Sequence, residues 1–167
     1  MAYIPLLLAI ALLAWFVAAY NKLVRLRNQV KNAWHQIEVQ LKRRYDLIPN
    51  LVEVVKDYMS YEQETLTRVI EARGAALSAK GAAAQAKAEN ALTESLKSLF
   101  AVVENYPELK ANQNVASLQE ELTATENKIS FARQFYNDSV MTYNNATQSI
   151  PSNLVASLFE FAQEAYF

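Results

Sequence analysis

The sequence predicts an all-α protein, in which an N-terminal transmembrane helix continues into an antiparallel helical bundle of three long helices and a short C-terminal helix. Only 2 Gly and 4 Pro occur among 167 residues, which leaves few sites for tight hairpin turns. Apolar residues recur every three or four positions over long stretches, which is the period of an amphipathic helix. Residues 2–21 contain no charged side chain, as a membrane span requires.

The N-terminal stretch "AYIPLLLAIALLAWFVAAYN" is long enough to cross a bilayer. At ~1.5 Å per residue it covers ~30 Å, which is the thickness of the hydrocarbon core. A signal peptide cleaved after Ala19 is the alternative, but no Lys or Arg precedes the apolar run and the run is long for a signal. We therefore predict an uncleaved anchor over residues 1–21 and a bundle domain over residues 22–167.

The charges that follow the span predict its orientation. Residues 22–44 carry seven basic side chains and one acidic side chain, a net charge of +6, whereas residues 45–167 have a net charge of −7. Basic flanks favour the cytoplasmic side, so we expect the N-terminus outside and the domain in the cytoplasm, with a periplasmic domain as the alternative. The bilayer, including its anionic headgroups, is a predicted partner. The acidic remainder argues against nucleic acid as a partner.

The first soluble helix should continue the span without a break. Its apolar stripe keeps the same register on both sides of Pro49, because Leu41, Ile48 and Val55 are each seven residues apart. This phase predicts a bent continuous helix rather than a chain reversal at the proline. We expect the helix to run to about Arg73 and to end at Gly74.

The remaining helices are bounded by prolines and candidate caps. The Ala-rich residues 74–89 are expected to form a loop or a weak helical extension. A second helix is predicted over residues 92–106, ended by Pro107. A third begins after Asn112 or Asn114 and is closed by Pro151. The tail over residues 152–167 should be an amphipathic helix, whose shared apolar face comprises Leu154, Leu158, Phe161 and Ala165.

Catalytic and metal-binding patterns are not recognisable in the sequence. The chain has no Cys, so thiolate ligands, disulfides and cysteine nucleophiles are excluded. His35 is the only histidine, which is too few for the paired Glu-x-x-His motifs of di-iron bundles or for a two-histidine zinc site. Gly74 and Gly81 stand alone among alanines and make no phosphate-binding loop. We expect a non-enzymatic protein without a cofactor or metal.

Polar residues near the apolar stripes are the main candidates for a structural site. Arg44 lies beside the first stripe with Asp46 two residues on, and the third helix carries Asn127, Arg133 and Asn137 among its aromatics. Asn and Asp are poor choices inside helices unless they bond to another element. A buried network that sets the register of the bundle and an ordinary solvated face both remain open.

Several segments resemble the LemA family of bacterial proteins: "YNKLVRLRNQVKNAWHQIEVQLKRRYDLIPNLVEVVKDY", "ENYPELKANQN", "LQEELTATENKISFARQFYNDSV" and "IPSNLVASLF". The resemblance implies an anchored helical bundle at the bacterial inner membrane, and a magnetosome-formation member implies a membrane-organising role. None of the family-motif residues is an established catalytic residue. The tail departs from the family pattern, which implies glycines near Ser157 and Glu160. The motif positions that we take as a structural network are Arg43, Arg44, Asp46, Pro49, Asn50, Glu104, Asn105, Tyr106, Pro107, Glu126, Asn127, Arg133, Tyr136 and Asn137.

We predict that the protein is a scaffold or a self-assembling subunit. The second helix, about 15 residues or ~22 Å long, is too short to cover the first soluble helix. Leu26, Val30 and Ile37 should then be left bare and should form a homo-oligomer interface. The alternative is a membrane-tethered adaptor or regulator that binds a client membrane protein without self-assembly.

Overall fold

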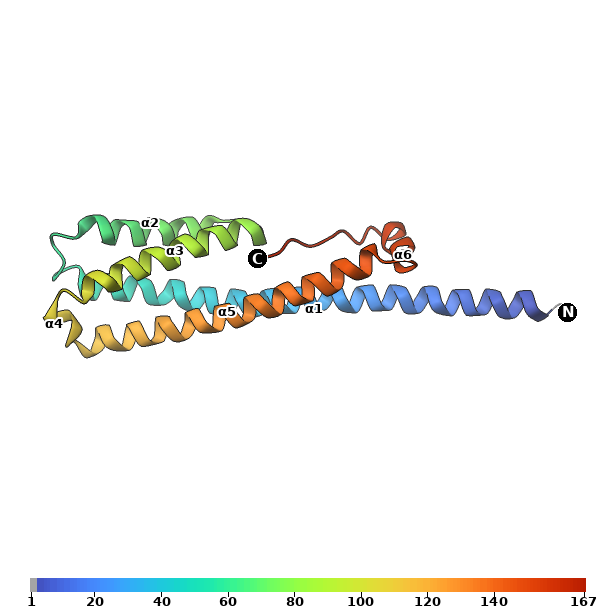
Figure 1. Cartoon of the computed structure of the whole chain (residues 1–167), viewed down its shortest axis with the longest axis horizontal. Coiled ribbons are helices and arrows are strands. Elements are labelled where there is room, and N and C mark those ends of the chain that lie inside the picture. Colours follow the sequence, from blue (N-terminus) through green and yellow to red (C-terminus); the bar gives the residue numbers. More distant parts are fainter. Residues whose placement is uncertain (1–2) are drawn as a thin grey trace. The chain divides into compact units, whose positions relative to one another are not determined.

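The computed structural model describes residues 3–167, and these residues form helices and connecting segments without a strand (Figure 1). The predicted all-α class, with a long apolar N-terminal helix followed by a helical bundle, is confirmed. The helices are α1 (Tyr3–Val55), α2 (Gln63–Ser78), α3 (Ala82–Val103), α4 (Pro107–Lys110), α5 (Gln113–Gln148) and α6 (Ser152–Leu158).

Helix α1 runs through Pro49 without interruption, as the unbroken register predicted. The expected end near Arg73 is wrong, because α1 stops at Val55 and the chain turns over residues 56–62. The backbone N–H groups of Tyr58 and Met59 both donate to the carbonyl of Val55, each at 3.1 Å. Met59, which is part of this turn, is fully buried. The signal for the turn was local, since the apolar stripe lapses at Glu62.

The Ala-rich segment over residues 74–89 is almost entirely helical, so of the two expected alternatives the helical extension is found and the loop is not. Gly74 lies inside α2, and only residues 79–81 connect α2 to α3. Gly81 has φ 84°, a left-handed conformation that favours glycine, and α3 starts directly after it. Helix α3 therefore begins ten residues before Leu92, because alanine is the strongest helix former and needs no large apolar residue to extend the helix.

The C-terminal elements agree with the prediction up to Gln148. The side-chain oxygen of Asn112 accepts hydrogen bonds from the N–H groups of Asn114 (2.9 Å) and Val115 (3.3 Å), so it caps α5 as predicted. Helix α6 ends at Leu158, however, and the chain beyond it is not helical. The predicted single apolar face of the tail is therefore wrong: Leu154 and Leu158 are exposed, whereas Phe161 is buried.

The contacts divide the described chain into two compact units. Unit 1 contains residues 3–35 and 134–166, and its core includes Leu23, Val140 and Tyr143. Unit 2 contains residues 36–133 together with Phe167, and its core includes Ile48 and Leu99. The division into an anchor over residues 1–21 and a bundle over residues 22–167 stays a prediction.

Candidate functional site

A buried polar cluster in unit 2 is built around Arg44, which projects from α1. Its Nη1 lies 3.1 Å from a carboxylate oxygen of Glu89, and its Nη2 lies 3.0 Å from Glu126 and donates to the hydroxyl of Thr93 at 2.7 Å. Arg44 is 2% exposed and the side chain of Glu89 3%. Because Gln85, Glu89 and Thr93 are spaced four residues apart, they present one polar face of α3 to this arginine.

Tyr45 joins the same group, which we call the Arg44 cluster (Arg44, Tyr45, Gln85, Glu89, Thr93 and Glu126). The Tyr45 hydroxyl donates to Glu89, and the side-chain amide of Gln85 donates to the Tyr45 oxygen at 2.8 Å. Burial, reinforced by the hydrogen bond to the Glu89 carboxylate, raises the pKa of the Tyr45 phenol. The phenol therefore stays protonated and acts as a donor.

Pro49 has a direct consequence for how α2 packs. Proline has no N–H, so the carbonyl of Tyr45, four residues earlier, loses its partner within the helix. The Nε of Arg73 on α2 donates to this carbonyl at 2.9 Å. Pro49 thus frees an acceptor on α1 that a side chain of another helix occupies.

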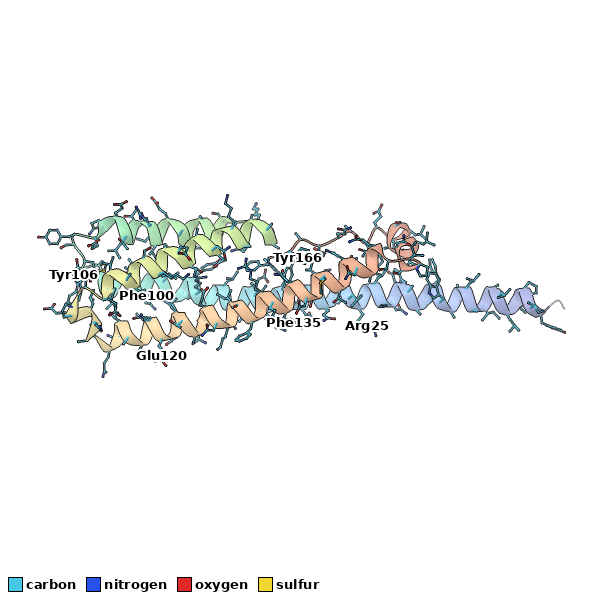
Figure 2. All side chains as sticks on the ribbon, in the orientation of Figure 1. Arg25, Phe100, Tyr106, Glu120, Phe135 and Tyr166 are labelled. Carbon is cyan, nitrogen blue, oxygen red and sulfur yellow. The ribbon has the colours of Figure 1, made fainter. Side chains whose placement is uncertain are left out.

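A pocket of about 190 Å³ borders the Arg44 cluster between α3 and α5. Arg44, Thr93 and Glu126 line its polar part, and Leu96, Phe100 and Leu122 provide most of its apolar wall. Figure 2 labels Phe100 on α3. Within the described residues, no group of three or more His, Asp or Glu is placed to hold a metal ion. The pocket can accept an apolar side chain beside a paired arginine, a geometry suited to binding.

In unit 1 the polar side chains of α5 hold the non-helical tail. The side-chain amide of Asn144 donates to the carbonyl of Glu164 and its oxygen accepts from the N–H of the same residue, both at 2.9 Å. The hydroxyls of Tyr136 and Tyr143 donate to tail carbonyls at 2.8 and 2.9 Å. Burial raises the pKa of both phenols, as does the nearby Glu164 carboxylate. These bonds satisfy tail backbone groups that have no helical partner.

The turn that joins α6 to the tail uses a left-handed residue. Glu160 has φ 54°, and the N–H of Phe161 donates to the carbonyl of Ala156 at 2.9 Å. This is the 6→1 hydrogen bond of a Schellman motif, in which glycine usually occupies the left-handed position. The family pattern implied a glycine near this position. The non-glycine residue here adopts the left-handed conformation at an energetic cost.

The structure brings some of the predicted network residues together and leaves others apart. Arg44 and Glu126 meet in the Arg44 cluster, and Pro49 acts through the Tyr45 carbonyl. Tyr136 holds the tail in unit 1, and in unit 2 Arg133 donates to the carbonyl of Phe167 at 3.0 Å. The surface positions are Arg43, Asp46, Asn50, Glu104, Asn105, Pro107 and Asn127, while Tyr106 and Asn137 are half-buried.

Two of these surface positions form ion pairs with other exposed side chains. Arg43 pairs with Glu121 at 3.2 Å, and Glu104 pairs with Lys110 at 2.8 Å, near the start of α4. Such exposed pairs contribute little to stability.

The sequence prediction missed several residues that make these contacts: Tyr45, Arg73, Gln85, Glu89 and Thr93. A usable signal existed in α3, where polar side chains recur every four residues among alanines. No comparable signal marked Arg73, whose partner is a backbone carbonyl in another helix.

The premise of the predicted oligomer interface is wrong. Val30 and Ile37 are buried within the chain and Leu26 is half-buried, so this face of α1 is not bare. Leu26 and Val30 belong to unit 1, which contains no part of α3, so their cover comes from residues 134–166. Self-association itself stays a prediction.

Comparison with known proteins agrees with this anchored helical architecture. The LemA family model matches residues 33–167. Protein LemA of Metamycoplasma hominis is 24% identical over 153 residues, which cover 91% of this chain and 70% of that protein. Magnetosome protein MamQ 2 of Paramagnetospirillum magneticum is 24% identical over 190 residues, covering 98% of this chain and 70% of that protein. The chain therefore belongs to the LemA family, as a membrane-associated protein with one N-terminal helix long and apolar enough to cross a membrane.

Proposed function

We propose that this LemA-family chain is a single-pass protein of the bacterial inner membrane that acts as a non-enzymatic scaffold and assembles with copies of itself. The buried charges of unit 2 support a structural role, because Arg44 is paired with two carboxylates inside the bundle. The relatives named as magnetosome proteins support a role at a membrane-bound structure.

The observation that carries self-assembly is an apolar stripe on the outer face of α2. Ile70 is 54% exposed and Leu77 is 53% exposed, and Gly74 lies between them. The spacing of four and then three residues places all three on one side of the helix, as in a coiled-coil seam. A Cβ added at Gly74 would meet no atom within 4 Å, so a second helix can approach closely there.

The test is the size of the full chain in detergent and in lipid nanodiscs, measured by native mass spectrometry. Ile70→Asp and Leu77→Asp should reduce an oligomer to monomers, because an unpaired charge is costly inside an apolar interface. Arg68→Asp is the matched control, since it introduces the same side chain at an exposed position on α2 outside the stripe. A wild-type monomer under both conditions would refute the self-assembly.

The pocket between α3 and α5 favours a second candidate, a tethered adaptor that binds a client protein. An apolar side chain of a client would enter against Leu96, Phe100 and Leu122. Phe100→Ala, at a half-buried position of the pocket wall, would then weaken capture of the client by the full chain and leave the oligomeric size unchanged. The scaffold proposal expects the opposite sensitivity, with the size depending on α2 and not on this pocket.

We also propose that the bundle faces the cytoplasm, on the strength of the +6 flank after the span. A fluorescent reporter that matures only in the cytoplasm, fused after Phe167, should be active. An alkaline phosphatase fusion at the same point should be inactive. Phosphatase activity would place the bundle in the periplasm and overturn the orientation.

A further inference from the structure

An exposed apolar surface surrounds the short helix α6 in unit 1. Ile150 is 86% exposed and Leu154 and Leu158 are each 67% exposed, and the spacing of four residues puts the two leucines on one face of the helix. The opposite side, with Val155 and Ala156, is buried against the protein. A contiguous apolar surface of this kind is rarely left in water.

No charged residue interrupts this region. Between Asp138 and Glu160 the sequence has no Lys, Arg, Asp, Glu or His. This long uncharged stretch, residues 139–159, contains the whole of α6. The apolar N-terminal part of α1 is the other long stretch without charge. Both stretches belong to unit 1.

Contacts within unit 1 place α6 beside the end of the membrane span. The ring of Phe159 lies 5.9 Å from the ring of Phe16 and 4.8 Å from that of Tyr20, measured between centroids. A pocket of about 530 Å³ is lined by Trp15 and Lys22 together with Ile150 and Ser152. Figure 1 shows the N-terminal part of α1 extending beyond α6.

The length of the span fixes the depth of α6. Lys22 is the first charged residue of the sequence, and the apolar segment from Tyr3 to Asn21 directly before it matches the about 20 residues that a hydrocarbon core of ~30 Å needs. Phe16 is six residues from Lys22, which is ~9 Å along the helix axis. Helices that lie in the membrane interface are buried by ~5–10 Å, the same depth.

We infer that α6 is a second membrane contact, an interfacial helix whose Leu154 and Leu158 insert into the lipid at the boundary between headgroups and acyl chains. The occupant of this apolar face is therefore the bilayer that α1 crosses. The inference rests on the proposed membrane crossing of α1.

The experiment exploits the absence of cysteine in the chain. Single substitutions Leu154→Cys and Leu158→Cys are labelled with an environment-sensitive fluorophore in the full-length protein, reconstituted in phosphatidylcholine–phosphatidylglycerol nanodiscs. Lipids that carry a nitroxide near the headgroup end of the acyl chain serve as quenchers. Leu8→Cys reports on the span, and Val39→Cys, at an apolar residue of similar exposure (63%) in unit 2, is the matched control outside the span.

Quenching at Leu154→Cys and Leu158→Cys should be severalfold stronger than at Val39→Cys. Quenching at Leu8→Cys alone would refute the interfacial position of α6 and leave the membrane crossing intact. A lack of quenching at Leu8→Cys would instead refute the crossing itself. Blue-shifted emission at Leu154→Cys and Leu158→Cys without lipid quenching would mean that a second copy of the chain covers this face, which also overturns the inference.

Discussion

Removing the negative charge of Glu89 should destabilise the bundle far more than removing that of Glu121, although both carboxylates pair with arginines of α1. Glu89 is 3% exposed and lies 3.1 Å from Arg44, whereas the pair of Glu121 with Arg43 lies at 3.2 Å with both side chains about half exposed. The two pairs thus differ in burial and in the hydrogen bonds that Glu89 also accepts from Tyr45 and Gln85. Glu89→Gln and Glu121→Gln keep the shape of the side chain and form a matched comparison.

The magnitudes follow from the partners that remain. Breaking a buried ion pair costs about 3–5 kcal/mol when the other charge is left alone. In Glu89→Gln the guanidinium of Arg44 still has Glu126 at 3.0 Å, so we expect a smaller loss, about 2–3 kcal/mol. Arg44→Met leaves Glu89 buried without a cation and should cost about 4 kcal/mol. Glu121→Gln should cost about 0.5 kcal/mol or less, because the pair is in solvent.

The assay is urea unfolding of the full chain in detergent micelles, followed by far-ultraviolet circular dichroism. The double variant Arg44→Met with Glu89→Met should lose less stability than the sum of its single variants, by about 1–3 kcal/mol, since it leaves no fully buried unpaired charge. Glu126 also loses its arginine, but its side chain is 42% exposed. If the losses for Glu89→Gln and Glu121→Gln agree to within about 0.5 kcal/mol, burial does not determine the strength of the Arg44 cluster and the reasoning fails.

Three further outcomes can be measured in the same unfolding assay. Arg73→Met should reduce the free energy of unfolding by about 1.5–3 kcal/mol in the native chain. The loss should be smaller in a Pro49→Ala background, because the restored N–H can then bond to the Tyr45 carbonyl. Equal losses in the two backgrounds would contradict the role of Pro49. Glu160→Gly should stabilise the protein by about 0.5–1 kcal/mol, because glycine adopts the left-handed conformation without a steric penalty, and a loss of stability would exclude strain at this residue. Because the pKa of Tyr45 is raised in the folded state, the contribution of this residue to stability should be fully present below pH ~10, the pKa of an unfolded tyrosine, and should be lost as the pH rises above it. Tyr45→Phe should reduce this alkaline loss, and an unchanged profile would contradict the assignment.

The fold class and several boundaries could be read from local signals in the sequence. The period of apolar residues identified α1 and α5, and its unchanged phase across Pro49 correctly indicated one helix. Asn112 was recognisable as a cap because its side chain bonds to N–H groups only two and three residues away. These features depend on neighbouring residues, so no knowledge of distant contacts was needed.

The candidate site was only partly predictable for the complementary reason. Arg44 and Glu126 were recognisable as polar residues near the apolar stripes, but their positions in the sequence did not indicate which residues they would contact. Glu89 lies 45 residues from Arg44 along the chain, in an Ala-rich stretch that was predicted as a loop or a weak helical extension. Composition favoured a helix there without showing that one face of it would be buried.

By itself, the sequence determined that this chain is helical, carries one apolar N-terminal helix and continues through Pro49, because periodicity and capping act over a few residues. Only the tertiary structure decided where α1 turns back, which carboxylates pair with Arg44, and that the tail leaves the helical conformation after Leu158. The tail shows the physical reason most clearly. Its amphipathic pattern would suit a helix, but side chains of α5 satisfy its backbone groups, among them Asn144, which bonds both backbone groups of Glu164. Those bonds come from residues about 20 positions or more away, so they can override a local preference that the sequence alone displays.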